Sequence, residues 1–302
     1  MVLFKGSAHS LDEVFEMART GEIQSFELTT RVSFRGSFRQ REFVSPNVVA
    51  LLPGKHDKLR NSYLLVSAHY DHLGIGPEKD GDSIYNGVFD NASGVAAVLE
   101  IARLMSQELP TPDRSMVFLF TTGEEKGLLG SHFYTEHPAV PLYRTIANVN
   151  VDGLALFDEF TDVIGVGADL SELSQFLAAT ADELGLTVSS LPAQFDRLRE
   201  FNRSDQAAFA EAGIPSVLLL EGLGHKASTR NQALLKVLAW NQNYYHSPFD
   251  DLDQPLNYMA ARQHCGVILL FCLRLANSSF QPEWNDGVPY INKRLQTRAE
   301  RR

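Results

Sequence analysis

The chain has 302 residues, a length that allows one large α/β domain or two smaller ones. Hydrophobic residues make up 44% of it and charged residues 21%, a globular composition that excludes disorder, collagen and coiled coil as the main architecture. Acidic residues outnumber basic ones by 37 to 27, and the formal net charge of -10 argues against nucleic acid as a partner.

The sequence predicts neither a transmembrane segment nor an export signal. The most apolar run, residues 265–273, is far shorter than the roughly 20 residues that cross a bilayer, so we expect a buried helix there. The first residues lack the apolar core of a signal peptide. Cys265 and Cys272 would lie about 10 Å apart along this helix, too far for a disulfide, so cysteine usage does not reveal the compartment.

Apolar runs along the chain predict the strands. Residues 26–34 alternate between apolar and polar side chains, which is typical of a half-buried strand, and residues 47–52 are expected to form the next one. Four further runs are short, nearly continuous and rich in β-branched or aromatic residues, as in strands buried on both faces. They are residues 63–68, 115–120, 146–151 and 215–220.

Helical spacing of apolar residues separates these runs, in residues 95–105, 170–184, 206–212 and 258–275. The alternation predicts a single three-layer α/β domain with a mixed, mainly parallel sheet flanked by helices. Ligands of such sheets bind beyond the carboxyl ends of the strands, so the active site is expected there. Residues 222–244 are expected to be an irregular region whose loops line the substrate pocket.

Imidazole and carboxylate side chains follow three of the buried strands directly, and others precede a helix or stand late in the chain. They are His69, Asp71 and His72, then Glu124 and Glu125, then Asp152, together with Asp90 and His246. Each pattern alone is commonly a hydrogen-bonded pair, a helix cap or a solvated surface. Their conjunction predicts a cation site, because adjacent glutamates at the end of a buried strand would otherwise repel each other.

Two imidazoles with three carboxylates suit zinc, or a pair of zinc ions bridged by a carboxylate. Asp90 is the natural bridge. His69 and Asp152 can complete one metal site, and Glu125 and His246 can complete the other.

The neighbours of these ligands suggest further roles. In extended backbone Glu124 and Glu125 point to opposite sides, so one can ligate while the other stays free as a base. Asp71, two residues beyond His69, is expected to accept the second imidazole N–H of that ligand. Asp250, four residues after His246, is a candidate for a similar role.

At this point the sequence resembles a known family, the co-catalytic di-zinc aminopeptidases typified by bacterial leucine aminopeptidase and related to glutamate carboxypeptidase II. The matching segments are residues 67–74, 90–94, 123–131, 150–152 and 245–246. The resemblance implies the same metal ligands with two Zn²⁺ ions, Glu124 as general acid/base, and a cis peptide bond after Asp90. It also implies that Tyr245 donates a hydrogen bond to the oxyanion, with a core aromatic beside Tyr244 as the competing interpretation.

One matching motif departs from the family. Residues 203–206 read Arg-Ser-Asp-Gln, where relatives commonly have Arg-Ser-Asp-His. Gln206 lies outside the ligand set, so we expect an altered pocket wall rather than lost metal binding. Arg203 either contacts the substrate near its amino end or is an ordinary surface arginine at a helix start.

The resemblance also implies that the chain has two parts. We expect residues 1–46 to pack on a catalytic domain formed by residues 47–302. In larger relatives such a segment returns from an inserted protease-associated domain. The chain is then either part of a longer exported protein or a natural minimal form, and a cytoplasmic location stays open.

The activity that the resemblance implies is zinc-dependent removal of the N-terminal amino acid from peptides with a free N-terminus. Two alternatives stay open: a single-zinc glutaminyl cyclase, and a non-catalytic binding module of the kind found in the transferrin receptor ectodomain. Carboxypeptidase or dipeptidase specificity also stays open, because the metal centre does not dictate which end of the substrate is recognised. Side-chain preference and oligomeric state are not read from the sequence.

Overall fold

The computed structural model describes residues 3–37, 44–192, 195 and 197–300. The chain divides into two compact units, Met1–Val44 and Ser45–Arg302. This boundary lies close to the predicted limit at residue 46. The packing of the first unit on the second stays a prediction.

The N-terminal unit contains the helix α1 (Leu11–Thr20). Ser10 and Glu13 close its first turn reciprocally: the Ser10 hydroxyl accepts the Glu13 backbone N–H at 3.3 Å, and the Glu13 carboxylate accepts the Ser10 backbone N–H at 2.7 Å. Gly21 ends the helix in the left-handed conformation, with φ 74°.

The strand predicted at residues 26–34 is absent from the described residues of this unit, so that prediction is wrong. Val32 and Phe34 keep 76% and 80% of their surface exposed. Alternation alone does not make a strand, because an extended segment is stabilised only by pairing with a neighbour.

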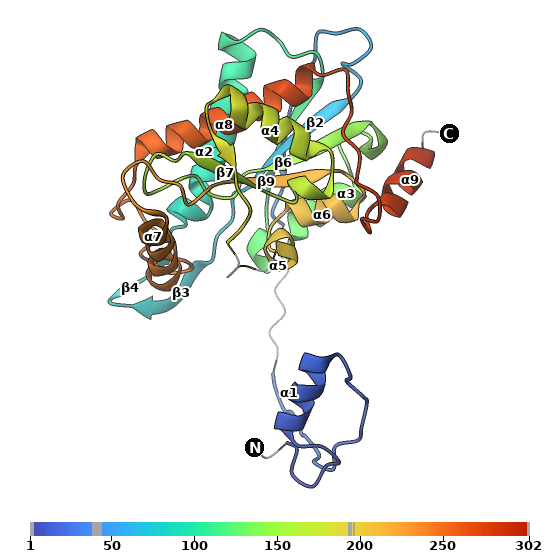
Figure 1. The fold of residues 1–302 in the computed structure, drawn as a ribbon, viewed down its shortest axis with the longest axis vertical. Helices are drawn as coiled ribbons and strands as arrows, with labels where there is room; N and C mark the ends of the chain where they lie inside the picture. The colour runs from blue at the N-terminus through green and yellow to red at the C-terminus, as the bar shows by residue number, and fades with distance from the viewer. Residues whose placement is uncertain (1–2, 38–43, 193–194, 196, 301–302) are drawn as a thin grey trace. The chain divides into compact units, whose positions relative to one another are not determined.

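A seven-stranded sheet forms the centre of the second unit in the part of the chain that the structure describes, in the order β1-β5-β2-β6-β9-β7-β8 (Figure 1). Its strands are β1 (Val48–Leu52), β2 (Tyr63–His69), β5 (Ser115–Thr121), β6 (Thr145–Asn150), β7 (Asp162–Val166), β8 (Thr187–Val188) and β9 (Ser216–Glu221). β5, β2, β6 and β9 run parallel to one another, as do β7 and β8. Only β1 with β5 and β7 with β9 pair antiparallel among these strands, which confirms the predicted mixed, mainly parallel sheet.

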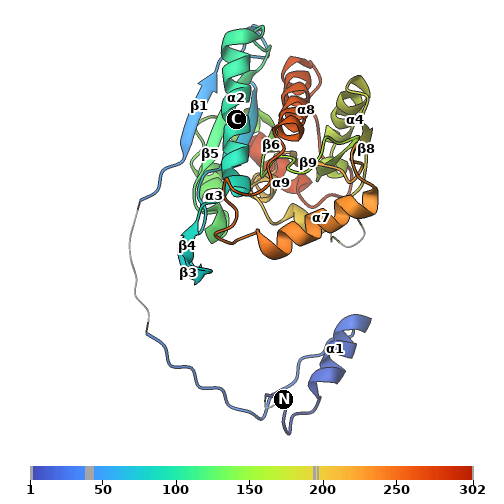
Figure 2. The ribbon, with the colours of Figure 1, turned by 90° about the vertical axis from the view of Figure 1, so that its left-hand side faces the viewer.

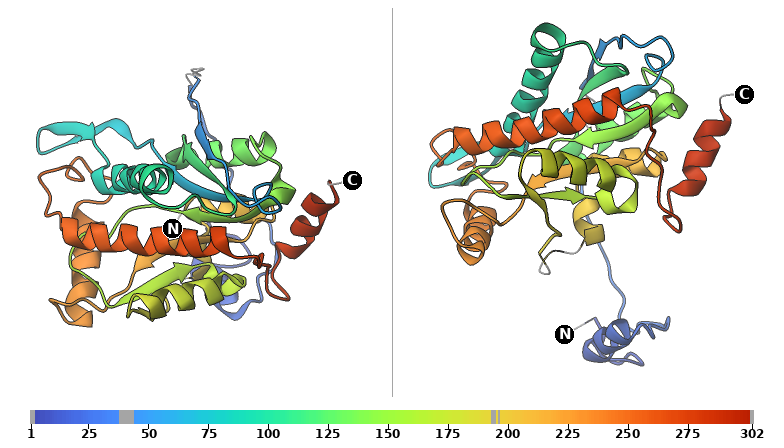
Figure 3. Two further views of the ribbon diagram at one scale, coloured as in Figure 1. Left: turned by 90° about the horizontal axis from the view of Figure 1, so that it is seen from above. Right: turned by 45° about the horizontal axis from the view of Figure 1, so that its top comes forward.

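Helices cover both faces of the sheet (Figures 2 and 3). One face carries α2 (Gly94–Arg103), α4 (Leu173–Glu183) and α8 (Tyr258–Asn277), and the other carries α3 (Leu129–Glu136), α5 (Arg197–Phe201) and α6 (Gln206–Glu211). Successive residues of β2 serve both layers. Leu64 and Val66 pack in the core with α2 and α8, whereas Leu65 packs in the core with α3 and α6. This double burial explains the nearly continuous apolar runs of the central strands.

Short helical turns complete the unit together with α9 (Ile291–Ala299). They are η1 (Val88–Ser93), which is kinked and non-helical at Asp90 and Asn91, the π turn η2 (Leu104–Glu108), and the 3₁₀ turns η3 (Glu124–Lys126), η4 (Leu142–Arg144) and η5 (Ala168–Leu170).

The helix α8 contains the most apolar stretch of the chain. Among the described residues it is the one helix long and apolar enough to cross a membrane by length and composition. Val267, Ile268 and Phe271 are fully buried in the largest core cluster, where α8 packs against α2 and α4. Cys265 and Cys272 are both free. These contacts agree with the predicted buried helix.

Residues 222–244, expected to be irregular, contain the helix α7 (Arg230–Asn243). Thr229 and Gln232 form a capping box at its start. Only Ala233 and Trp240 are buried among its described residues, and exposed leucines blur its periodicity. The hairpin of β3 (Gly74–Lys79) and β4 (Asp82–Tyr85) was likewise not predicted.

Candidate metal centre

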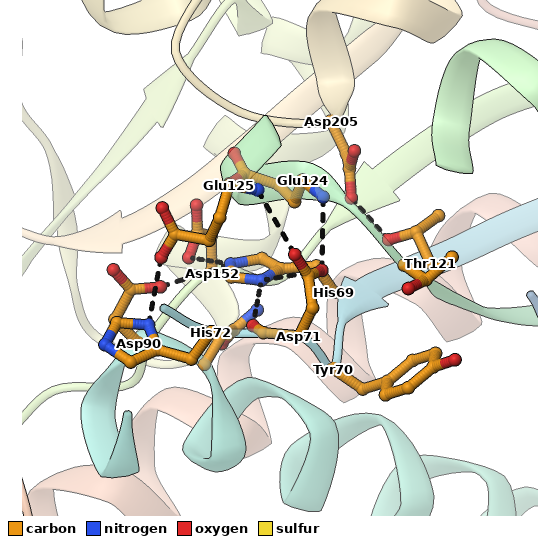
Figure 4. A network of polar contacts seen from close by, with 12 residues as sticks. His69, Tyr70, Asp71, His72, Asp90, Thr121, Glu124, Glu125, Asp152 and Asp205 are labelled. Atoms are coloured by element: carbon orange, nitrogen blue, oxygen red, sulfur yellow. Dashed lines mark hydrogen bonds and ion pairs between the residues drawn. The ribbon is translucent and has the colours of Figure 1, made fainter. Parts of the chain in front are cut away.

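Ligand-type side chains converge beyond the carboxyl ends of β2, β5 and β6 (Figure 4). His69 is the last residue of β2, and Asp152 lies two residues beyond β6. Glu124 and Glu125 open the turn η3 after β5, and Asp90 lies in η1 at the entry to α2. Parallel strands end at the same edge of the sheet, which is why residues so far apart in sequence meet here.

The carboxylate of Asp90 lies between two imidazoles. Its Oδ1 is 3.2 Å from Nε2 of His69, and its Oδ2 is 3.2 Å from Nε2 of His246. The Asp90–Asn91 peptide bond is cis, as the resemblance implied. The Asn91 side chain donates to the Val151 carbonyl at 2.9 Å and so ties this loop to the end of β6. One oxygen facing each imidazole is the arrangement that a bridging carboxylate requires.

The charged side chains form two groups that could each hold a metal ion. His69, Asp152 and Glu124 offer one group of ligand atoms within 4.8 Å of one another, and His72, Asp90 and Glu125 offer the other. Nε2 of His69 is 3.2 Å from Oδ1 of Asp152. Oε1 of Glu125, a member of the second group, is also 3.2 Å from Nε2 of His246, which lies outside that group. The structure therefore brings all five predicted ligands and Glu124 together.

His72 is the residue that sequence reasoning left without a role. Its Nδ1 lies 2.9 Å from Oε1 of Glu125, and its ring meets that of His246 edge-on at 5.7 Å. Nε2 of His72 is buried without a hydrogen-bond partner. Its place three residues after His69 was the only available signal. An orphaned imidazole nitrogen beside a buried carboxylate fits a zinc ion, whose preferred ligands are imidazole and carboxylate.

The pKa values of the adjacent Glu124 and Glu125 are shifted in opposite directions. Burial raises the pKa of Glu124 to about 9, since it outweighs the attraction of a nearby imidazole. Burial also opposes ionisation of Glu125, but contacts with His246 and His72 lower its pKa to about 2. The backbone forms a 3₁₀ turn after Gly123 (φ 68°) instead of the extended geometry assumed from sequence. The two carboxyl groups nevertheless belong to different groups of ligands.

Carboxylates retain protons on the imidazoles of the site. Burial disfavours the charged form of His69, yet Asp152 and Asp90 hold its pKa well above the ordinary value. Asp90 and Glu125 likewise raise the pKa of His246 to about 9 against the effect of burial. A bound cation would replace these protons, because a ligating imidazole is neutral.

The contacts of Asp71 differ from the prediction. Its carboxylate lies 3.8 Å from Nδ1 of His69, and its backbone carbonyl is the closer partner at 3.1 Å. The carboxylate instead accepts the backbone N–H groups of Glu124 at 3.1 Å and Glu125 at 3.3 Å. Asp71 thus positions the turn that carries both glutamates.

Tyr245 and Arg203 contact each other beside the predicted metal ligands. The Tyr245 ring stacks on His246 at 3.9 Å between centroids, and its hydroxyl accepts a hydrogen bond from Nη2 of Arg203 at 3.1 Å. Burial raises the pKa of Tyr245 to about 12. Arg203 therefore orients Tyr245, a role that neither sequence interpretation named.

Gln206 is fully buried and does not form a pocket wall, contrary to expectation. Its side-chain oxygen accepts from Nδ2 of Asn150 at 2.9 Å, and its side-chain nitrogen donates to the Phe201 carbonyl at 2.7 Å. It joins the end of β6 to α5 and α6.

Comparisons with known proteins agree with this geometry. The model of peptidase family M28 matches residues 47–272. The chain belongs to this family. The M28 chain is 28% identical to aminopeptidase YwaD of Bacillus subtilis over 214 residues, which cover 69% of the chain and 40% of YwaD. It is 32% identical to a vacuolar membrane protease of Lodderomyces elongisporus over 111 residues, covering 37% of the chain and 10% of that protein. The M28 chain therefore spans less than half the length of these curated relatives.

Solved structures share the M28 fold. The aminopeptidase of Aneurinibacillus sp. strain AM-1 aligns with a TM-score of 0.54 at 25% identity, covering 78% of this chain and 48% of the other. The glutaminyl cyclase of Porphyromonas gingivalis aligns with a TM-score of 0.52 at 15% identity, covering 74% and 76%. The second likeness concerns the fold alone.

Proposed function

We propose that this M28 chain is a zinc-dependent aminopeptidase that hydrolyses the N-terminal peptide bond of peptides with a free N-terminus. The observation that carries the proposal is the Asp90 carboxylate between His69 and His246, at 3.2 Å from each. Membership of family M28 and the names of its relatives support the activity.

Two zinc ions would be held with Asp90 as the shared ligand. His69 and Asp152 would complete one site, and Glu125 and His246 the other. When bound, the ions would polarise the scissile carbonyl and lower the pKa of a water molecule. His72 lies against Glu125 and would support the second site.

Glu124 is the proposed general base and acid. Burial around Glu124 favours the protonated carboxyl, which suits the return of a proton to the leaving amine, and bound cations would lower its pKa so that it could first take that proton from the attacking water. Asp71 fixes the backbone of Glu124, so the carboxyl is held at one place for both transfers. The neighbouring carboxylates attract the free α-amino group, which limits hydrolysis to chain ends.

Tyr245 is the proposed donor to the oxyanion. The Arg203 guanidinium at 3.1 Å leaves the hydroxyl proton of Tyr245 free to point elsewhere, since the hydroxyl oxygen accepts from Arg203.

A glutaminyl cyclase is the second candidate, supported by the shared fold of the bacterial cyclase. The complete set of five ligands favours the peptidase. One relative is named a vacuolar membrane protease, which favours a membrane-associated or vacuolar location.

Mass spectrometry of peptide products tests the proposal. Zinc-loaded protein is incubated with short peptides that carry free, acetylated or glutamine N-termini, with and without a chelator. Chelator-sensitive loss of one residue from free peptides alone is the expected result. Loss of ammonia from glutamine peptides would indicate a cyclase, and unchanged peptides would indicate a non-catalytic module.

A further inference from the structure

The two glutamates of the metal centre lie on a loop whose ends meet. The loop, residues 123–129, begins after β5 and ends in the first turn of α3. Its neck is formed by Thr122 and Gly130, which lie so close that a Cβ atom on Gly130 would be 2.2 Å from the Thr122 carbonyl oxygen. The outer part of the loop is exposed, and Leu129 keeps 56% of its surface accessible. The position of the loop therefore depends on the contacts of its backbone more than on packing.

The side chain of Asn47 joins the two sides of this neck. Its Oδ1 accepts the backbone N–H of Thr122 at 3.1 Å, and its Nδ2 donates to the backbone carbonyl of Gly130 at 2.7 Å. A single amide thus satisfies a donor at one end of the loop and an acceptor at the other. Asn47 directly precedes β1, which lies beside β5 and pairs with it from Val48 onward (Figure 2). The amide is therefore anchored on the sheet, a rigid element.

The backbone of the loop needs such an external hold. Leu128 has the left-handed conformation, with φ 58°, which is unfavourable for a residue that carries a Cβ atom and persists only where surrounding contacts impose it. Asp71 restrains the middle of the loop, because its carboxylate accepts the backbone N–H groups of Glu124 and Glu125. Asn47 restrains the two ends. Together these two side chains fix the backbone on both sides of Glu124.

We propose that Asn47 is a positioning residue for peptide hydrolysis, which holds the Glu124 carboxyl at the place where it transfers protons. Asn47 acts through the backbone of the loop. Proton transfer requires the carboxyl within hydrogen-bond reach of the reacting groups, and a small displacement of such a group can lower the rate by orders of magnitude. The inference rests on the proposed aminopeptidase function and adds a residue that precedes all the predicted metal ligands in the chain.

Ser115 offers a matched control at the opposite end of β5. Its hydroxyl accepts the backbone N–H of Gly54 at 2.9 Å and donates to the backbone carbonyl of Arg60 at 2.7 Å. Like Asn47, it joins two backbone segments through one side chain, but it does so at the end of β5 remote from the metal centre. If Asn47 supported only the fold, Asn47→Ala and Ser115→Ala would both lower stability and leave the kinetics unchanged.

Hydrolysis of a peptide with a free N-terminal leucine by the zinc-saturated proteins tests the inference. We expect Asn47→Ala to lower kcat by about 10–100-fold and to change KM by less than about threefold. Ser115→Ala should keep both constants. Circular dichroism and metal analysis establish that each variant is folded and loaded with zinc. If Asn47→Ala does not fold, Asn47→Asp keeps the acceptor for the Thr122 N–H, loses the donor to Gly130, and should show a smaller fall in kcat.

A double-mutant cycle with Glu124→Gln assigns the effect to Glu124. In that background Asn47→Ala should cause little further loss, because the displaced side chain no longer transfers a proton. Additive losses would overturn the inference, as would an unchanged kcat in folded Asn47→Ala or equal falls in Asn47→Ala and Ser115→Ala.

The unmodified protein separates the two levels of the account. If it hydrolyses the leucine peptide and Asn47→Ala does so equally well, only the role of Asn47 is refuted. If the unmodified protein hydrolyses no peptide, the proposed function fails and the inference fails with it.

Discussion

The carboxylate of Asp250 holds the backbone of Asp90. Its Oδ2 accepts the Asp90 N–H at 3.1 Å, and its Oδ1 accepts the N–H of Phe89 at 2.8 Å. Asp250 is fully buried, and sequence reasoning had placed it behind His246. It instead fixes the loop that presents the carboxylate between the two imidazoles.

Asp250→Asn tests this support. An amide offers one accepting oxygen, so one of the two backbone N–H groups loses its partner, at a cost of about 1–3 kcal/mol in the free energy of unfolding. Zinc affinity should fall as well. Denaturant unfolding and zinc titration measure both effects, with the exposed Asp253→Asn as control. Unchanged stability and affinity in Asp250→Asn would refute the role of this contact.

Variants of Glu124 and Asp90 should lose different properties. Glu124→Gln keeps the shape of the side chain but removes its proton transfer, so we expect bound zinc to persist and kcat to fall by about 10²–10⁴-fold. Asp90→Ala removes the shared ligand and should lose metal and stability together. Metal analysis, thermal unfolding and peptide hydrolysis distinguish the two variants. Equal loss of zinc in both would contradict the assignment.

The metal centre could be predicted from the sequence because its determinants are local. His69 and Asp152 directly follow continuous apolar runs, and parallel strands carry such residues to one edge of the sheet. The outer contacts could not be predicted in this way. Asp71 and Asp250 bind backbone N–H groups far along the chain, and the direction of their side chains depends on turns that sequence spacing does not specify.

Outside the metal centre, the features that were mispredicted also depend on interactions with residues remote in the sequence. The strand predicted at residues 26–34 has the right alternation but no partner within the described residues of its unit. The helix α7 has a good capping box, yet exposed Leu235 and Leu238 hide its amphipathic pattern. Gln206 reads as a pocket residue in its motif and is in fact a buried link between β6 and α5.

His72 should affect metal affinity more than the fold. His72→Asn removes the imidazole that lies 2.9 Å from Glu125, and we expect about a 10–100-fold weaker affinity for one zinc equivalent. Calorimetric zinc titration measures this change. His56→Asn, outside the site, is the control. Identical binding curves for His72→Asn and the unmodified protein would exclude a role for His72 at the metal.

Tyr245 and Arg203 should act together. Tyr245→Phe removes the proposed oxyanion donor, so kcat should fall by about 10–10³-fold with little change in KM. Arg203→Met should cause a smaller fall in kcat, because the guanidinium acts through the Tyr245 hydroxyl. The double variant should be no worse than Tyr245→Phe. Additive losses in a double-mutant cycle would show that the two side chains act independently.

The buried His264 should make the stability of the folded protein depend on pH. Burial lowers its pKa from 6.5 to about 4, so between these values the unfolded chain binds more protons than the folded chain. The stability that the neutral, buried His264 provides is fully present above pH 6.5. It is lost as the pH falls through about 4, and the free energy of unfolding then decreases by up to about 3 kcal/mol. Denaturant unfolding at several pH values should give a shallower slope in this window for His264→Gln. Parallel slopes would refute the prediction.

Zinc titration of metal-free protein, with hydrolysis of a free N-terminal peptide followed at each step, tests the central claim most directly. The account predicts that two equivalents bind per chain, that activity reaches its plateau with the second, and that a chelator abolishes it. Saturation at one equivalent, or peptide hydrolysis that survives complete removal of metal, would contradict a shared-carboxylate pair of zinc ions.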